Sequence, residues 1–295
     1  MIYQENRDKK RASTYIYWLS NRNTMEPLEV YNKIYKQIQS IFSSRLKIQI
    51  LLSAAGGPKN LSELRDVTGS TSQAIIPKIR SLERLSLLEP CDHGYGITPL
   101  GRVLVTKIGD LVVTMGELMQ HREFWATHDI EGIPQPFLYQ IGDLISSDVK
   151  FDTTDNMFHV YTHFVSILQQ AGYIHGISSF MNPQIADVLS ERIVAGVPVE
   201  LVVSHSIAEG LIQEPFLSKI QQLRPYKNFK IWVVDEPLNL GITVTDKNLS
   251  LGLNKKINAV YDSSADMHSS DPKAREWAER LFQYYRGKAV LLELG

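Results

Sequence analysis

Cysteine is almost absent from this chain, and so are long apolar runs. The single cysteine among 295 residues, Cys91, excludes an intramolecular disulfide and any zinc site built from several cysteines. No apolar stretch approaches the roughly 18 residues that a membrane-spanning helix needs, and no apolar leader core follows the N-terminus. With a hydrophobic fraction of 43% and a charged fraction of 21%, the composition predicts a globular cytoplasmic protein of two domains without membrane association.

Catalytic signatures are also missing. The sequence contains no Gly-x-Ser-x-Gly motif, no Walker loop and no dinucleotide-binding glycine fingerprint. His159 and His163 are spaced as i and i+4 on a predicted helix, but no acidic third ligand has the spacing of a zinc-hydrolase motif. A packed or surface histidine pair is therefore the favoured interpretation. Cys91 has no neighbour that would stabilise a thiolate. We expect no catalytic residue, no metal site and no cofactor.

The net charge of −1 conceals an asymmetry along the chain. Residues 1–100 contain 14 Lys and Arg against 9 Asp and Glu, a net charge of +5. The remaining residues contain 17 against 23, a net charge of −6. A mildly basic N-terminal third is typical of a module that contacts phosphates, whereas DNA repels an acidic remainder.

Residues 43–101 have the element order of a winged helix-turn-helix. The elements are an apolar helix over 46–52, a helix with a capping box of Asn60 and Glu63, a turn at 68–70, a helix from Thr71, and two β-prone runs, 87–89 and 95–97, around a turn at 92–94. Three helices followed by a hairpin predict a domain that binds DNA through its third helix.

The third helix is the predicted recognition helix. Its apolar residues recur at helical spacing, and its other side is polar. The predicted DNA contacts are Ser70, Thr71, Ser72, Gln73, Lys78, Arg80 and Arg84, with His93 at the hairpin tip. Gln73 is suited to pair with adenine, and the basic residues to reach phosphates. A merely solvated face is the alternative. Pro77 inside this helix indicates either a start near Ala74 or a bend.

The segments on either side of this domain have different patterns. Residues 1–24 form a polar tail, which is either an arm that touches DNA or a partner, or a non-functional extension ahead of a start at Met25. A long helix is predicted over 99–127, with a heptad seam of Leu104, Ile108, Leu111, Met115, Leu118 and Trp125. The seam indicates a homodimer, and packing within its own domain is the alternative. The run Gly132–Pro136 marks a domain junction.

The second half of the chain alternates strands and helices. Strands are predicted at 173–177, 199–203, 229–234, 241–245, 249–253, 259–261 and 289–294, with capped helices that begin at Pro183 and Pro272. The pattern predicts an α/β sandwich. The fold is accordingly α+β / α/β, in four parts: a tail (1–24), a winged helix-turn-helix domain (25–103), linker or dimerisation helices (104–150), and an α/β domain (151–295) that senses an effector or dimerises.

Three segments resemble those of a known family. They are Thr71–Pro77 with Leu82-Glu83, His128–Pro134, and Val260–Asp266 followed by Trp277–Phe282. Through them, residues from about 25 to 290 resemble archaeal winged-helix transcriptional regulators typical of methanogens, with an ArsR-like N-terminal domain and a methanogenesis-regulator middle domain. The resemblance implies sequence-specific binding to double-stranded DNA and an intended proline at position 77. A more distant similarity extends to sugar-sensing TrmB-type regulators.

The chain also distantly resembles the phospholipase D fold, which keeps an enzyme of nucleotide or phosphodiester chemistry as an alternative function. That chemistry needs a nucleophilic histidine with a lysine two residues later. His205 is followed by Ser206-Ile207 and His268 by Ser269-Ser270, so the sequence argues against this enzyme. A third alternative is a protein-interaction module whose winged helix no longer binds DNA.

An effector site is predicted where polar residues follow strands. Asp262, Ser263 and Ser264 follow the predicted strand 259–261, and Ser178 and Ser179 follow the strand 173–177. Ligands of open α/β sheets bind beyond the carboxyl ends of strands, so these five residues are the candidates for a small-molecule effector. A loop whose polar groups only cap a following helix is the equally weighted alternative. The prediction as a whole is a homodimeric transcriptional regulator.

Overall fold

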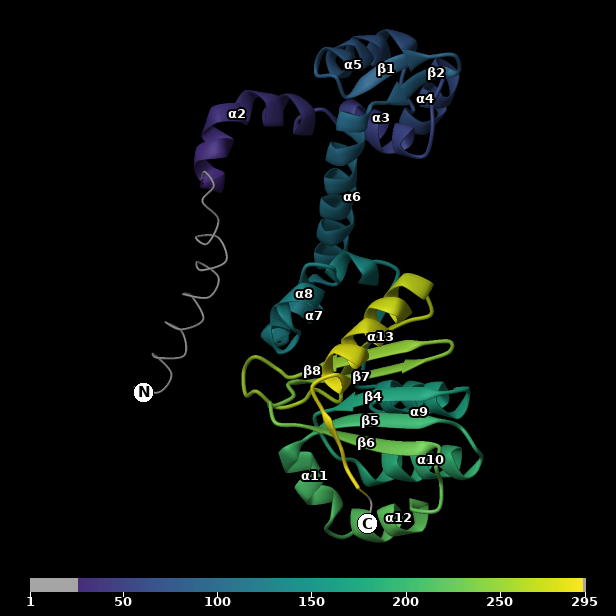
Figure 1. Cartoon of the computed structure of the whole chain (residues 1–295). Coiled ribbons are helices and arrows are strands. Elements are labelled where there is room, and N and C mark those ends of the chain that lie inside the picture. The colour runs from purple at the N-terminus through teal and green to yellow at the C-terminus, as the bar shows by residue number, and fades with distance from the viewer. Residues whose placement is uncertain (1–25, 294–295) are drawn as a thin grey trace. The chain divides into compact units, whose positions relative to one another are not determined.

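The computed structural model describes residues 26–293, and the chain divides into two compact units, Met1–Gly109 and Asp110–Gly295 (Figure 1). The predicted tail, residues 1–24, lies outside the described residues. No helix among residues 26–293 is long and apolar enough to cross a membrane.

Within its described residues, 26–109, the N-terminal unit contains four helices, a hairpin and the start of a fifth helix. The elements are α2 (Pro27–Phe42), α3 (Arg45–Ala55), α4 (Leu61–Thr68), α5 (Ser72–Arg84), β1 (Leu88–Cys91), β2 (Gly94–Ile97) and α6 (Pro99–Gln120). Side-chain caps fix the starts of three helices, because Ser44, Asn60 and Thr71 each accept a hydrogen bond from the backbone of the first turn. The capping box of Asn60 and Glu63 is present as predicted.

Helix α5 corrects one expectation about Pro77. The helix begins at Ser72, directly after its cap Thr71, so a late start near Ala74 is wrong. Pro77 lies inside the helix and is exposed. The ring removes one backbone hydrogen bond, but it sits on the solvent side, where water satisfies the freed carbonyl.

A small apolar core holds the N-terminal unit together. Ile50 and Leu51 of α3, Leu64 of α4, and Ile75 and Ile79 of α5 are almost fully buried within it. The hairpin joins this core through Leu88 of β1, and the backbones of Lys59 and Tyr95 add a bridge between the loop before α4 and β2. The buried stripe of α5 leaves its opposite side free.

The predicted helix over 99–127 is interrupted. Helix α6 ends at Gln120, His121 has non-helical backbone angles, and α7 (Arg122–Thr127) follows. The predicted seam is divided as well. Ile108 is buried in the core of the N-terminal unit, and Trp125 is buried in the other unit. Leu111 and Met115 are 46% and 54% exposed.

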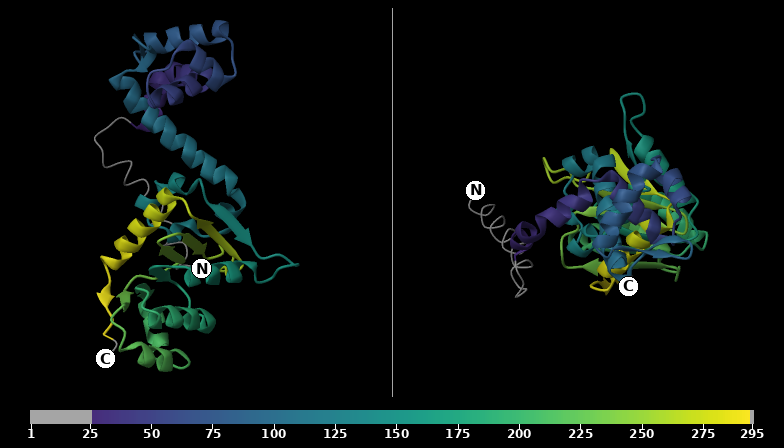
Figure 2. Two further views of the ribbon diagram at one scale, coloured as in Figure 1. Left: turned by 90° about the vertical axis from the view of Figure 1, so that its right-hand side faces the viewer. Right: turned by 90° about the horizontal axis from the view of Figure 1, so that it is seen from above.

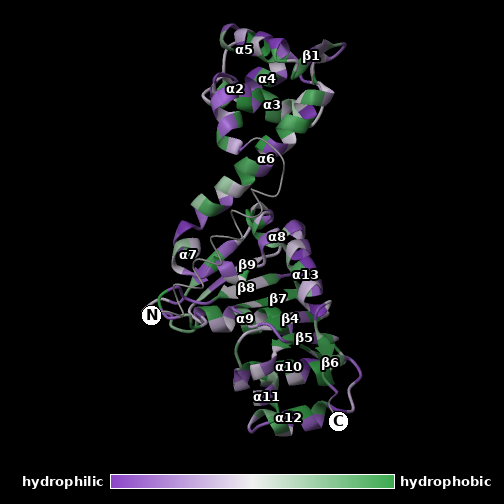
Figure 3. Cartoon of the chain, turned by 60° about the vertical axis from the view of Figure 1, so that its left-hand side comes forward, coloured by the Kyte–Doolittle hydropathy of each residue, from purple (hydrophilic) through white to green (hydrophobic). Residues whose placement is uncertain are grey.

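An eight-stranded mixed sheet is the centre of the C-terminal unit. Its strand order is β10-β6-β5-β4-β7-β8-β9-β3, in which β4, β5 and β6 are parallel and the other pairs antiparallel. The strands are β3 (Asp148–Phe151), β4 (Ile174–Ser178), β5 (Val199–Ser204), β6 (Phe229–Val234), β7 (Leu240–Thr245), β8 (Leu249–Leu253), β9 (Ala265–Ser269) and β10 (Val290–Leu291). The central strands are mostly apolar (Figure 3), as burial on both faces requires.

Helices cover both faces of this sheet (Figures 1 and 2). One face packs against α9 (His159–Gln169), α10 (Pro183–Val194), α11 (His205–Leu211) and α12 (Phe216–Leu223). The other packs against α13 (Pro272–Arg286), α7, α8 (Gln135–Leu138) and the 3-10 turns η1 (Ile130–Gly132) and η2 (Ile141–Leu144). Trp277 of α13 is fully buried there and donates a hydrogen bond to the carbonyl of Phe137. The predicted mixed α/β unit is thus present.

Two predicted strands need correction. The run 259–261 is not a strand, because only an isolated bridge joins Tyr261 to Asn254. The strand of this region is β9, which follows residues 262–264, so these three residues precede a strand instead of a helix. The final strand is limited to Val290–Leu291.

Candidate DNA-contact surface and effector pocket

An exposed polar stripe runs along α5. Gln73, Pro77, Arg80 and Arg84 recur at spacings of four, three and four residues, which places them on one side of a helix. All four are exposed, and the side chains of Gln73, Arg80 and Arg84 make no hydrogen bond or ion pair with any described residue. The stripe therefore presents three polar side chains without partners in the described part of the chain, and a proline that has no backbone N–H to satisfy.

Lys78 does not belong to this stripe. It lies about 140° around the helix from Gln73, since each residue advances about 100°, and it is half-buried. Burial lowers the pKa of Lys47 on α3, and the charges of Lys78 and Arg84 lower it further. Lys47 donates hydrogen bonds to Ser40 at 2.9 and 2.8 Å. Lys47, Lys78 and Arg84 therefore form a cluster of like charges, which an anion would relieve.

The remaining predicted DNA contacts lie at the start of α5 and at the hairpin tip. Thr71 caps the helix through Ala74, and Ser70 and Ser72 are half-buried beside it. His93 is exposed at the tip, next to Gly94 with a φ of +124°. A Cβ at Gly94 would overlap the carbonyl of Lys59, so glycine is required for the hairpin to approach the loop before α4.

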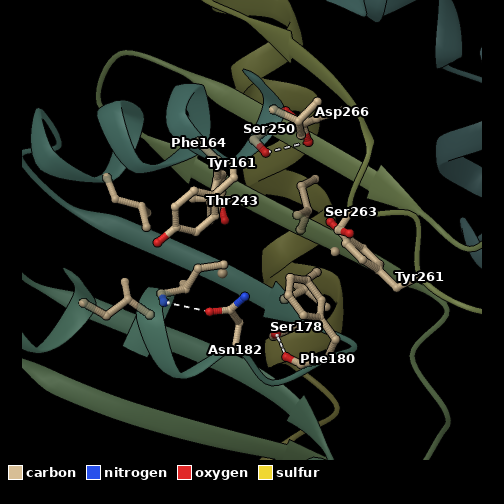
Figure 4. Close-up of a pocket in the computed structure, with 18 of the residues that line it drawn as sticks. Tyr161, Phe164, Ser178, Phe180, Asn182, Thr243, Ser250, Tyr261, Ser263 and Asp266 are labelled. Atoms are coloured by element: carbon tan, nitrogen blue, oxygen red, sulfur yellow. Dashed lines mark hydrogen bonds between the residues drawn. The ribbon is translucent and has the colours of Figure 1, made fainter. Parts of the chain in front are cut away.

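A cavity of ≈ 140 Å³ lies between the sheet and the helices α9 and α10 (Figure 4). Its walls are mostly apolar, with Phe164 of α9 and Leu201 of β5 among them. Its polar lining comes mainly from the neighbouring strands and the loops that follow them: Ser178, Asn182, Thr243, Ser250, Asp262, Ser263 and Asp266. The sheet order places β4, β7, β8 and β9 side by side, which brings together residues distant in sequence.

Three of the five predicted effector residues line this cavity, and two do not. Ser178, Asp262 and Ser263 line it, whereas Ser179 and Ser264 are not among the lining residues. Ser178 donates its hydroxyl proton to the carbonyl of Phe180 at 2.7 Å. The hydroxyl of Ser179 is buried without a hydrogen-bond partner among the described residues.

Asp262 is fully paired with protein groups. Its Oδ2 lies 3.1 Å from Nε2 of His128, and its Oδ1 accepts from Lys255 at 3.2 Å and from the backbone and hydroxyl of Ser264 at 3.0 and 2.5 Å. Burial alone would raise the pKa of Asp262, but the bonds from Ser264 and Lys255 hold this pKa below its usual value. Asp262 fixes the loop ahead of β9, and its charge is already compensated.

Asp266, unlike Asp262, has an oxygen without a partner among the described residues, and it was not predicted from the sequence as a site residue. The residue is 5% exposed, its Oδ1 accepts a hydrogen bond from Ser250 at 2.8 Å, and its Oδ2 is buried without a partner in the described part of the chain. Burial raises the pKa of Asp266 to about 7, and the bond from Ser250 opposes this only in part. The alternation of Asp266 and His268 with the apolar Ala265 and Met267 was the available signal, but the run Ala265–Ser269 was not predicted to be a strand.

The ring of Tyr261 closes one side of the cavity. It lies over Gly241 and Gly252, which pair across β7 and β8, and a Cβ on Gly252 would overlap the tyrosine hydroxyl. The ring also stacks on Phe180, with centroids 4.2 Å apart. Burial, together with the neighbouring Asp266, raises the pKa of Tyr261 far above its usual range, so the hydroxyl stays protonated.

The histidines of α9 lie outside the cavity lining. His163 packs edge-on against His268 of β9, with ring centroids 4.5 Å apart, and burial lowers the pKa of both. Within residues 26–293, no group of three or more His, Cys, Asp or Glu side chains is placed to hold a metal ion.

Two domain models and one curated relative that match this chain all belong to the FilR1 methanogenesis regulatory protein. The model of the FilR1 methanogenesis regulatory protein's N-terminal domain matches residues 35–116, and that of its middle domain matches residues 157–288. The chain carries both of these FilR1 domains, which confirms the predicted resemblance. It is 26% identical over 263 residues to the methanogenesis regulatory protein FilR1 of Methanothrix harundinacea (strain 6Ac), covering 88% of this chain and 59% of the relative.

The solved structures that match this chain include two with low TM-scores, which belong to proteins of different function. TrmBL2, an archaeal chromatin protein, has a TM-score of 0.39 at 14% identity, covering 88% of this chain and 100% of that chain. Nuc of Salmonella typhimurium, a phospholipase D family member, has a TM-score of 0.39 at 15% identity, covering 50% of this chain and 98% of that chain.

Proposed function

We propose that this protein is a sequence-specific DNA-binding transcriptional regulator, in which residues 25–103 form a winged helix-turn-helix domain. The observation that carries the proposal is the exposed stripe of α5, where Gln73, Arg80 and Arg84 have no partner among the described residues. A merely solvated face is the alternative, and the footprint described below separates the two. The name of the FilR1 relative, a regulatory protein, agrees with this assignment.

We infer the following division of the DNA contacts among these residues. Gln73, near the start of α5, is suited to an adenine edge in the major groove, because the first residues of a recognition helix meet the bases. Arg80 and Arg84 lie further along the same stripe and reach the backbone. Ser70, Thr71 and Ser72 supply donors at the helix N-terminus, where phosphates bind. Lys78 acts with Lys47 as a local positive field, and His93 approaches the minor groove.

Residues 104–150 link the domains and contribute to a homodimer. The support is apolar surface: Leu111, Met115 and Met119 recur every four residues on α6 and are 46%, 54% and 65% exposed. On α2, Leu28 and Tyr31 are also exposed, although they lie on the apolar side of an amphipathic helix. A second copy would bury both surfaces and pair two recognition helices on a pseudo-palindromic site.

Residues 151–295 form the effector-sensing domain of a cytoplasmic protein, and the cavity beside Asp266 is its binding site. Ser178, Ser263 and Asp262 belong to the lining, with Ser179 and Ser264 as supporting residues. We propose no enzymatic activity. Neither His205 nor His268 is followed two residues later by a lysine, and His268 is packed against His163.

Footprinting of the purified protein on DNA from its own upstream region tests the proposal. The double variant Gln73→Ala with Arg80→Ala should lose the footprint while keeping its fold, and Arg80→Ala alone should lower the salt slope of log K by about one. Arg224→Ala, an exposed arginine of the C-terminal unit, is the matched control and should bind as the parent does. An unchanged footprint of the double variant would show that α5 does not contact DNA.

A further inference from the structure

The cavity beside Asp266 has an unusual balance of charges. Among the described residues that line it, the only ionisable groups are the carboxyls of Asp262 and Asp266 and the phenols of Tyr161 and Tyr261, and no lysine, arginine or histidine is present. The two carboxyls differ in what surrounds them. Lys255 forms an ion pair with Asp262, and His128 lies within hydrogen-bond distance of it, whereas no cationic side chain of residues 26–293 forms an ion pair with Asp266.

A buried carboxyl oxygen without a partner calls for a donor. Oδ1 of Asp266 is held by the hydroxyl of Ser250, as Figure 4 shows, and this bond fixes the orientation of the unpartnered Oδ2. A buried polar atom without a hydrogen-bond partner destabilises the fold, and more so when its group is charged. Native proteins rarely retain such a cost unless a ligand or function removes it.

We propose that this cavity binds a small apolar amine as its cation, with the ammonium group donating to Oδ2 of Asp266 and the apolar group filling the space among the aromatic side chains. The inference deepens the proposed effector role, and only its regulatory consequence rests on that role. The cavity of ≈ 140 Å³ is close to the engineered cavity of about 150 Å³ that holds benzene. A ligand of one ring, or an alkyl chain of similar volume, therefore fits.

Charge decides between the classes of ligand. An anion would meet the uncompensated carboxyl in a weakly polar cavity, where like charges repel strongly. A cation would convert Asp266 into one half of an ion pair and would face the ring of Phe164 or Phe180, whose π electrons attract positive charge. A neutral alcohol would satisfy Oδ2 with one hydrogen bond but would supply no charge.

Four probes of nearly equal size separate these cases: benzylamine, benzyl alcohol, toluene and benzoate. Binding to the full chain is measured by calorimetry and ligand-observed NMR at pH 8, without DNA. Benzylamine should bind at least about tenfold more tightly than toluene, because a hydrogen bond to a charged group is worth that much. Benzyl alcohol should lie between them, and benzoate should be the weakest. Equal affinity for benzylamine and toluene, or tighter binding of benzoate, would overturn the inference.

The variant Asp266→Asn removes the charge and keeps the shape. It should bind toluene as the parent does, which shows that the cavity is intact, and should lose the tenfold preference for benzylamine. Glu117→Gln is the matched control, because Glu117 is another fully buried carboxyl with an oxygen that accepts no hydrogen bond from the described residues, and it lies outside the cavity lining. Its benzylamine affinity should be unchanged. A preference that survives in Asp266→Asn would place the amine elsewhere. If the variant does not fold, the four-probe series on the parent chain decides alone.

The regulatory role is tested separately. Benzylamine that binds through Asp266 but leaves DNA affinity unchanged would support the amine site and contradict its role as the effector site. If the parent protein does not bind DNA, the proposed function is refuted, but the result of the probe series still stands.

Discussion

Replacement of Asp266 by asparagine should remove a loss of stability that the C-terminal unit suffers as the pH rises from about 4 to 7. The folded protein keeps this carboxyl protonated up to a pKa of about 7, because burial disfavours the charged form, while the ordinary value is 3.8. The raised pKa of an acid means that the folded state binds more protons than the unfolded state between these values. The free energy of unfolding therefore falls as the pH rises from about 4 to 7.

The magnitude follows from the size of the shift. A rise of roughly three pKa units, at about 1.4 kcal/mol for each, makes the ionised carboxyl cost about 4 kcal/mol above pH 7. The substituted asparagine would keep the acceptor for Ser250 and carry no charge, so Asp266→Asn should be about as stable as the parent below about pH 4 and roughly 1.6 kcal/mol more stable at pH 5. At pH 8 it should be more stable, by up to about 4 kcal/mol.

Urea denaturation at several pH values between 5 and 8.5 measures this difference. Tryptophan fluorescence is the suitable probe, because Trp125, Trp232 and Trp277 all lie in the C-terminal unit. Asp262→Asn is the control of opposite sign. The pKa of Asp262 is held low, so its loss should destabilise the protein at neutral pH, and this cost should shrink as the pH falls through the acidic range. A stability difference for Asp266→Asn that stays constant from pH 5 to 8.5 would refute the burial argument.

Local sequence signals predicted most helices and strands, but they did not predict where these elements are interrupted. Capping residues such as Asn60 and Asp271 and continuous apolar runs such as 229–234 gave helix starts and strands that the structure shows. The strand β9 was missed, although Asp266 and His268 alternate with apolar residues in it, because the strand of this region was assigned to the run 259–261. The predicted seam on 99–127 was divided because a heptad pattern does not say which apolar residue packs against which core.

The candidate pocket depends on contacts that no local pattern contains. Thr243 and Ser250 are cross-strand neighbours in β7 and β8, and Asp266 comes from the next strand of the sheet. The prediction of a site after strand ends found Ser178, the last residue of β4, and Asp262, which lies in the loop before β9. It could not find Asp266, because the cost of an unpaired carboxyl arises only when three strands and α9 bury it together.

Two further predictions concern the dimer and the cavity wall. Leu111→Glu with Met115→Glu should turn the proposed dimer into a monomer in sedimentation velocity, because charges would enter the apolar surface of α6. An unchanged dimer would place the interface elsewhere. Gly252→Ala should lower the free energy of unfolding by about 1 to 3 kcal/mol, since its Cβ would overlap the hydroxyl of Tyr261. In a Tyr261→Ala background the ring is gone, so the same glycine substitution should cost almost nothing. A double-mutant cycle by urea denaturation gives the coupling between the two positions. Equal costs in both backgrounds would mean that Gly252 is needed for its backbone conformation and not as a seat for the aromatic ring.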